Sequence, residues 1–276
     1  MKPAISDVSI RRGFIASALA ALFALTLRQN VRGRRLLVLS LLFLLPVVLA
    51  GVLNFVPYPP PPEISEFALV LHLIPHVLAP LTALLYAAGI VQDEVEEQTL
   101  TYLLLRPLPR WALYATRLAA AWLTTTVLTV LFTTLTLTVI YWNTSGLWGD
   151  VLPRRAATVA ALMALAQTGY CSLFGLIGLL TRRSLLTGLA YIIVFEGLLA
   201  NFDAVVRRLT VMYYFRVLSL HWLAPSGSEK WSIDLATAPS AERCLWTLLA
   251  VCALLVCLGA VVMRRREFRM KTAEGT

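Results

Sequence analysis

The chain has 276 residues, of which 59% are hydrophobic and only 14% charged, and its mean hydropathy is +0.76. Soluble domains are nearer half apolar and a quarter charged, so this composition excludes an ordinary soluble protein and indicates an integral membrane protein. The net charge of +9 does not indicate a nucleic-acid partner, because no soluble domain is expected that could hold a duplex.

Six apolar stretches are long enough to cross a bilayer, because a spanning helix needs about 20 mostly apolar residues. They cover residues 36–56, 67–91, 118–141, 157–180, 185–203 and 244–263. The sequence therefore predicts an all-α membrane protein with six transmembrane helices, in which residues 1–276 form a single transmembrane domain. The four cysteines all lie in these stretches, so we expect small core residues rather than a disulfide framework or a zinc site.

The positive charges are distributed unevenly between the two sides that six crossings define. With the N-terminus placed in the cytoplasm, 17 of the 24 Lys and Arg residues lie on that side and 7 lie outside. Positive residues are retained preferentially in the cytoplasm, so both termini are predicted to be cytoplasmic. The same residues are expected to attract anionic membrane lipids.

Residues 8–35 are predicted to form an N-terminal interfacial helix. The uncharged run from Gly13 to Leu27 is too short to span comfortably, and arginines flank it on both sides. Such a helix lies along the membrane surface with its apolar face in the lipid. The start SIRRGF superficially resembles a twin-arginine export signal, but the run leads straight into the first span instead of a polar mature start.

Residues 92–117, between the second and third spans, contain the least membrane-like stretch of the chain. Asp93 can cap a helix that carries Glu96 three residues later, a capping-box arrangement, and acidic residues are favourable at a helix start. We expect a short amphipathic cytoplasmic helix over residues 94–104, which the turn at Pro107 ends. The alternative is a solvated loop with interface anchors.

The stretch DEVEEQTLTYLLLRPLPRWALYATRLAAAW resembles the cytoplasmic motif of type-2 ABC transporter permeases. That motif runs acid-x-acid-x-Gly-Thr-Leu, then Leu-Leu, a Pro-x-x-Arg turn and a basic residue that opens the third helix. The matching positions are Glu94, Glu96, Thr99, Leu100, Leu103, Leu104, Arg106, Pro107, Arg110 and Arg117. Gln98 stands where Gly is usual, and Arg117 stands where Lys is common. The interfacial helix, the six spans and a long external segment before the last span also match the layout of that family.

The resemblance implies the permease subunit of an ATP-binding cassette exporter, in the bacterial cytoplasmic membrane. In this family the loop between the second and third spans is a coupling element that docks on an ATP-hydrolysing subunit, and two permease halves enclose the transport path. We therefore call residues 92–117 the coupling region, and expect a second permease copy or a homologous permease as a partner. The expected ATPase-coupling residues are Glu94, Glu96, Glu97, Thr99, Leu100, Leu103, Leu104, Arg106, Pro107 and Arg110.

The chain itself is not expected to bind ATP or to act as an enzyme. A P-loop needs Gly-Lys followed by Ser or Thr. Of the three lysines, Lys2, Lys230 and Lys271, only Lys271 precedes Thr, and it follows Met270 rather than Gly. We therefore expect ATP and Mg²⁺ on a separate P-loop ATPase subunit, and no cofactor, metal or catalytic residue in this chain.

Two other function classes remain open. An integral membrane enzyme could act on a lipid-linked substrate through the acidic cluster at 93–97, although the other cytoplasmic loops offer no second acidic cluster to face it. A secondary transporter would show inverted repeats or pairs of broken helices, and none stands out.

Ionisable residues inside spans are costly and are therefore candidates for function. Glu196 lies in the fifth span and is a candidate for the transport path or for helix packing, with a satisfied structural hydrogen bond as the alternative. His72 and His76 lie four apart in the second span, but HLIPH lacks the Glu of a zincin motif. Residues 204–243 form a long external segment whose aromatic and basic residues are typical of short helices at the outer interface.

Overall fold

The computed structural model describes residues 5–90, 109–144, 151–198, 205–225, 231, 233 and 238–265. Every regular element within these ranges is helical, which confirms the prediction of an all-α protein. In chain order the helices are α1 (Ile5–Arg32), α2 (Arg34–Asn54), α3 (Pro62–Glu66), η1 (Phe67–Leu78), α4 (Ala79–Ala87), α7 (Arg110–Ile140), α8 (Val151–Leu180), α9 (Ser184–Tyr191), η2 (Ile192–Leu198), η4 (Val205–Leu209), α10 (Val211–Leu223) and α11 (Ala241–Arg265).

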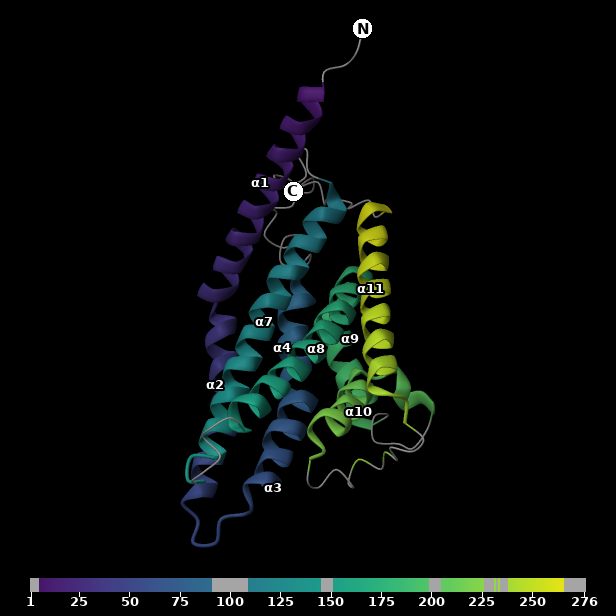
Figure 1. Ribbon diagram of the computed structural model, residues 1–276. Helices are drawn as coiled ribbons and strands as arrows, with labels where there is room; N and C mark the ends of the chain where they lie inside the picture. Colours follow the sequence, from purple (N-terminus) through teal and green to yellow (C-terminus); the bar gives the residue numbers. More distant parts are fainter. Residues whose placement is uncertain are drawn as a thin grey trace, which may run out of the picture.

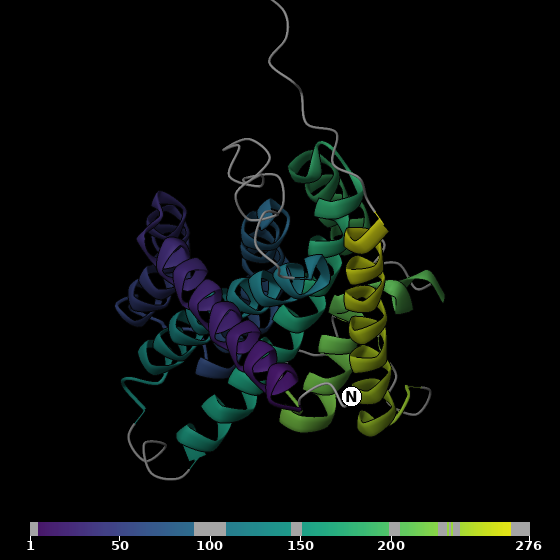
Figure 2. The same cartoon turned by 90° about the horizontal axis from the view of Figure 1, so that it is seen from above.

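The long helices form one bundle, with α1 and α2 on one side and α11 on the other (Figures 1 and 2). We call the end of the bundle at which α4 ends and α7 begins the upper end, and the end at which α3 and α8 begin the lower end (Figure 1). The helix α8 runs through the middle and packs against α4, α7, α10 and α11. This central helix therefore contacts elements from both halves of the sequence.

Five helical stretches are long and apolar enough to cross a membrane: Arg34–Asn54, Pro62–Ala87, Arg110–Ile140, Val151–Leu180 and Ala241–Arg265. They correspond to five of the six predicted spans. The predicted span at 185–203 corresponds to α9 and η2, which join in a shorter apolar helix, Ser184–Leu198. The 8 residues of α9 and the 7 residues of η2 together give a helix about 22 Å long at 1.5 Å per residue. This length is shorter than a hydrocarbon core of about 30 Å. Residues 199–204 lie outside the described residues, so the six-span count stays a prediction.

The predicted interfacial segment is helical, as the 28-residue helix α1. Gly33 separates α1 from α2 because its backbone is extended, with φ −71° and ψ 146°. The helix α1 packs along α7, and Asn30 Nδ2 donates to Thr124 Oγ1 at 3.3 Å. Whether α1 lies in a membrane surface is not tested by these contacts and stays a prediction.

The helix α7 begins at Arg110, eight residues before the predicted span at 118–141. Pro109 precedes it with an extended backbone, and its carbonyl oxygen accepts from Ala112 N at 2.9 Å and from Leu113 N at 3.2 Å. Proline cannot donate from its nitrogen but can accept in the first turn, so it suits a helix start. Residues 110–117 of the coupling region thus belong to the first turns of α7.

The second span is wound as a π-helix over η1, around Pro75. The proline ring clashes with the carbonyl of the preceding α-helical turn, and a wider turn relieves that clash. Two side chains of α8 satisfy carbonyls there: Tyr170 Oη donates to Pro75 O at 3.3 Å, and Gln167 Nε2 donates to Ala79 O at 3.3 Å. The irregular winding is therefore held by α8 rather than exposed to lipid.

The core contains aromatic and small side chains from several helices. Phe43 of α2 is fully buried and packs on Phe132 of α7, with ring centroids 5.7 Å apart. Of the four cysteines, Cys257 is exposed and the other three are buried. The opposite face of α2 is open, since Leu41 has 71% of its surface exposed. In a bilayer that face is available to lipid.

Replacing Phe43 with Ala should lower the free energy of unfolding by about 3 kcal/mol, because it leaves a cavity beside Phe132. Leu41→Ala, on the exposed face of the same helix, is the matched control, and should change stability by less than about 0.5 kcal/mol. Thermal unfolding of the purified protein in lipid nanodiscs measures both. Equal stability losses in the two variants would contradict the described packing of α2.

Candidate functional site

The residues on either side of the coupling region lie together at the upper end of the bundle. Arg117 Nη1, in the second turn of α7, donates to the carbonyl oxygen of Ile90 at 3.3 Å. Arg110, at the start of α7, is exposed. The other nine predicted coupling residues lie outside the described residues. The structure therefore describes the residues that flank this segment, Ile90 before it and the start of α7 after it.

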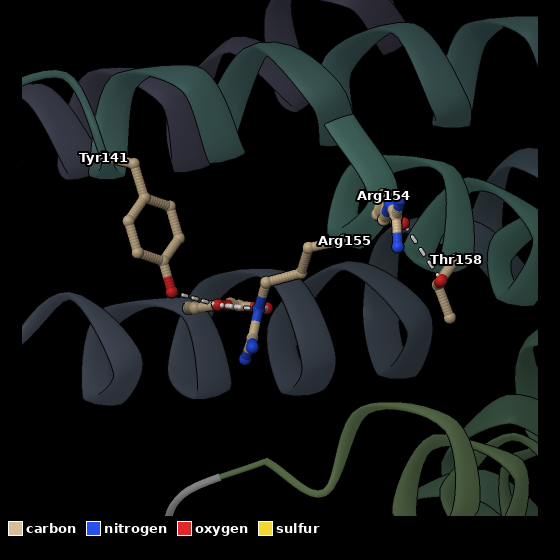
Figure 3. Close-up of polar contacts among 5 residues, drawn as sticks. Tyr141, Arg154, Arg155 and Thr158 are labelled. Atoms are coloured by element: carbon tan, nitrogen blue, oxygen red, sulfur yellow. Dashed lines mark hydrogen bonds and ion pairs between the residues drawn. The ribbon is translucent and has the colours of Figure 1, made fainter. Parts of the chain in front are cut away.

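An ion pair between a buried carboxylate and a partly buried arginine lies at the lower end of the bundle (Figure 3). Glu66 closes α3 and is buried, and Arg155 Nε of α8 donates to both of its carboxylate oxygens at 2.8 Å. Tyr141, directly after α7, donates its hydroxyl hydrogen to Glu66 Oε2 at 2.5 Å. The carboxylate therefore joins the second, third and fourth candidate spans at one point.

The Tyr141 hydroxyl acts in this cluster as a donor. Burial, together with its hydrogen bond to Glu66, raises the pKa of Tyr141 above its ordinary value. The phenol thus stays protonated at physiological pH and keeps a hydrogen to donate to the carboxylate. Removing one partner from a buried ion pair leaves an uncompensated charge, which is strongly destabilising. The cluster is a structural clamp of this end of the bundle.

Glu196 is completely buried, and its carboxylate accepts hydrogen bonds from backbone amides and from tyrosine side chains. Val211 N donates to Oε1 at 3.1 Å, Met212 N donates to Oε2 at 3.3 Å, and Tyr191 Oη donates to Oε1 at 3.4 Å. The two amides belong to the first turn of α10, where a helix favours a negative charge. These contacts agree with the alternative of a satisfied structural hydrogen bond for Glu196, while a role in the transport path or in helix packing stays a prediction.

The two histidines of the second span stack on each other. The rings of His72 and His76 lie 5.2 Å apart at 13°. Among the described residues, no group of three or more His, Cys, Asp or Glu could hold a metal ion. The two rings thus form a pair without a third His, Cys, Asp or Glu ligand among the described residues.

Most of the threonines in α7 direct their hydroxyls at their own helix. Such donors satisfy carbonyls three or four residues earlier in the chain. The residues that do so are Thr124, Thr125, Thr134, Thr136 and Thr138. Thr129 instead accepts a hydrogen bond from Gln167 Nε2 at 2.8 Å, which joins α7 to α8. These hydroxyls therefore serve the helix and its packing.

The family model described as ABC-2 family transporter protein matches residues 20–268 of the chain. The chain belongs to the ABC-2 transporter family. A search of curated proteins gave no match. The matched range begins within α1 and includes all five candidate spans, so the ABC-2 assignment covers nearly the whole described bundle. It confirms the resemblance to a type-2 ABC transporter permease.

Membership of the ABC-2 family makes this chain a membrane permease of an ABC transporter. It favours transport over the membrane-enzyme hypothesis for the 93–97 acidic cluster. Sequence reasoning missed the ion pair at the lower end, because Glu66 and Arg155 lie just outside the predicted spans at 67–91 and 157–180 and hydropathy does not show which span ends meet. The signal was available: an acid directly before one span and an arginine at the start of another meet when both begin at the same end of a bundle.

Arg155→Met should destabilise this ABC-2 permease by about 3 kcal/mol, because Glu66 keeps only Tyr141 as a donor in a buried site. Arg154→Met, at the exposed neighbour, should cost less than about 0.5 kcal/mol. Thermal unfolding of the two variants provides the comparison. If Arg155→Met unfolds like Arg154→Met, the ion pair is not a clamp.

Glu196→Ala removes the acceptor of the first two amides of α10. Those amides should then exchange with deuterated solvent at least about tenfold faster, since the loss of a helix cap costs roughly 0.5–2 kcal/mol and an unpaired buried donor costs more. Hydrogen exchange followed by mass spectrometry over residues 205–223 measures the effect. Exchange within α2 is the internal control and should not change. Unaltered exchange at Val211 and Met212 would show that Glu196 does not hold α10.

Proposed function

We propose that this ABC-2 permease crosses the membrane six times with both termini in the cytoplasm, and that its upper end is cytoplasmic. Two observations support the orientation. The first helix, α1, begins at the upper end, and the last helix, α11, ends there (Figure 1). The same end is where α4 ends and α7 begins. With six crossings, 17 of the 24 Lys and Arg residues lie on the side of the two termini, and such residues are retained preferentially in the cytoplasm. The sixth crossing would consist of Ser184–Leu198 together with residues that follow it.

We further propose that the coupling region docks on a separate P-loop ATPase, which binds ATP and Mg²⁺. The observation that carries this proposal is the hydrogen bond between Arg117 and Ile90, because it ties the two flanks of the region together at one end of the bundle. A movement of the ATPase against this region would therefore be transmitted to the second and third spans together. The acids of the region, at a predicted helix start, supply the charge for an oriented contact.

Two permease halves are proposed to enclose the path, because each chain supplies one coupling region and an ATPase pair needs two. The partner is a second copy or a homologous permease, and the complex works as an exporter in a bacterial cytoplasmic membrane. Most of the threonine hydroxyls of α7 are used within the helix or against α8, and among the described residues those of Thr126 and Thr133 are buried without a partner, so few polar groups remain for a hydrated ion. This pattern favours an apolar or amphiphilic substrate.

The triple variant Glu94→Ala, Glu96→Ala, Arg110→Ala tests the docking proposal. The acid changes remove roughly 0.5–2 kcal/mol of helix-start stabilisation, and the arginine change removes a charge-assisted contact of roughly 1.5–3 kcal/mol. Affinity for the ATPase should therefore fall at least about tenfold, since 1.4 kcal/mol is tenfold. Co-purification and titration of the ATPase against the permease in nanodiscs measure the change.

The matched control is Glu242→Ala with Arg243→Ala, an exposed acid and arginine at the start of α11, far from the upper end. It should insert, express and bind the ATPase like the wild type. A triple variant that also binds like the wild type would show that the coupling region is only a loop, and the docking proposal would then be wrong.

A further inference from the structure

Ala88, directly after α4, lies in close contact with the hairpin formed by α8 and α9. A Cβ at Gly178 would lie 2.5 Å from the carbonyl oxygen of Ala88 and 3.0 Å from its Cα. No side chain can move aside there, because the obstructing atoms are backbone. Across the hairpin turn, Ser184 Oγ donates to the same Ala88 oxygen at 3.4 Å. This contact leaves α4 no room to slide without moving α8 and α9.

A second contact fixes the same part of α4 to α9. A Cβ at Gly188 would lie 2.1 Å from Leu84 Cδ1, so the Leu84 side chain occupies the space that a larger residue at 188 would need. Leu84 is 2% exposed. We name these contacts, together with the bond from Arg117 to Ile90, the α4 anchor; it joins Leu84, Ala88 and Ile90 to Gly178, Ser184, Gly188 and Arg117.

The helix Ser184–Leu198, whose first residues belong to the α4 anchor, extends toward the lower end of the bundle. Ser184–Leu198 runs without interruption from α9 into η2. At its upper end it contacts α4 through Ser184 and Gly188, and near its lower end Glu196 holds the first turn of α10. One short helix thus connects the segment before the coupling region to an element at the lower end (Figure 1).

We propose that the α4 anchor and the Ser184–Leu198 helix form a strut that carries a displacement of the coupling region to α10. The inference rests on the proposed docking of an ATPase at that region. Close-packed backbone contacts resist compression steeply, so a shift of α4 passes into α9 rather than being absorbed by side chains. Gly178 and Leu84 act as positioning residues, because they set how closely α4 and the strut are joined.

The test follows α10 while ATP acts at the opposite end. The full-length permease, with Trp222→Cys labelled by an environment-sensitive fluorophore and Cys257→Ala to remove the exposed thiol, is assembled with its ATPase in lipid nanodiscs. In the otherwise unchanged chain, ATP should alter the fluorescence at position 222. Gly178→Ala should reduce this response about fivefold or more, a typical size for one coupling step, while the ATPase stays bound.

Gly51→Ala is the matched control for the glycine change. It makes the same substitution inside a helix, but the new Cβ would have its nearest neighbour, Val139 Cγ1, at 4.0 Å. The response at position 222 and the bound ATPase should both remain as in the unchanged chain. A loss of response in this control equal to that in Gly178→Ala would assign the effect to helix propensity and overturn the role of the α4 anchor.

A second pair keeps the test decisive if Gly178→Ala does not assemble. Leu84→Ala removes the contact without overpacking and should also reduce the response. Adding Gly188→Ala should restore part of it, because the new methyl group fills the space that Leu84 Cδ1 leaves. A structural defect alone would lower the unfolding temperature and ATPase binding together with the response. A Leu84→Ala complex that assembles and responds normally overturns the inference.

The outcomes separate this inference from the proposed function. A wild-type chain that binds no P-loop ATPase refutes the docking proposal, and the inference falls with it. A wild-type complex that binds the ATPase but shows no response at position 222 leaves docking intact and overturns the strut. A response that persists in both Gly178→Ala and Leu84→Ala has the same consequence.

Discussion

The structure depends on one constraint: inside a bilayer, a polar group must find its partner within the protein. The described bundle meets it by placing polar side chains of one helix against irregular backbone of another. Gln167 and Tyr170 of α8 satisfy carbonyls around the π-wound part of the second span, and Glu196 satisfies the amides that begin α10. At these two places a side chain from a neighbouring helix satisfies the backbone groups, and at the π-wound part of the second span α8 supplies it from the centre of the bundle.

The two ends of the bundle are held by different forces. At the lower end the Glu66–Arg155 ion pair attracts over several ångströms, so its strength changes gradually with distance. At the upper end Gly178 meets the Ala88 backbone, and overlap there is opposed by steep repulsion. An electrostatic contact tolerates small shifts and a backbone contact transmits them. The two ends therefore respond differently to a small displacement of their helices.

The sequence predicted the features of this fold that depend on the length of apolar runs and on a local sequence motif. Apolar runs of sufficient length located five of the spans, and the family resemblance at residues 93–117 was confirmed by the match over 20–268. Hydropathy could not predict the π-winding at Pro75, because that geometry depends on Tyr170 and Gln167, which lie far along the chain. It likewise named Glu196 as a functional candidate without revealing that α10 supplies its donors. Nine of the ten predicted coupling residues lie outside the described chain and stay predictions.

The ion pair at the lower end also bears on how the chain is assembled in the membrane. Glu66 enters the bilayer region with the second span, whereas Arg155 follows 89 residues later in the chain. Spans are synthesised in order, so the carboxylate is made well before the arginine that pairs with it. Tyr141 reaches it first, at the end of the third span, and can shelter it in the interval. The order of residues along the chain thereby sets an order of biogenesis, in which the second and third spans associate before the fourth completes the site.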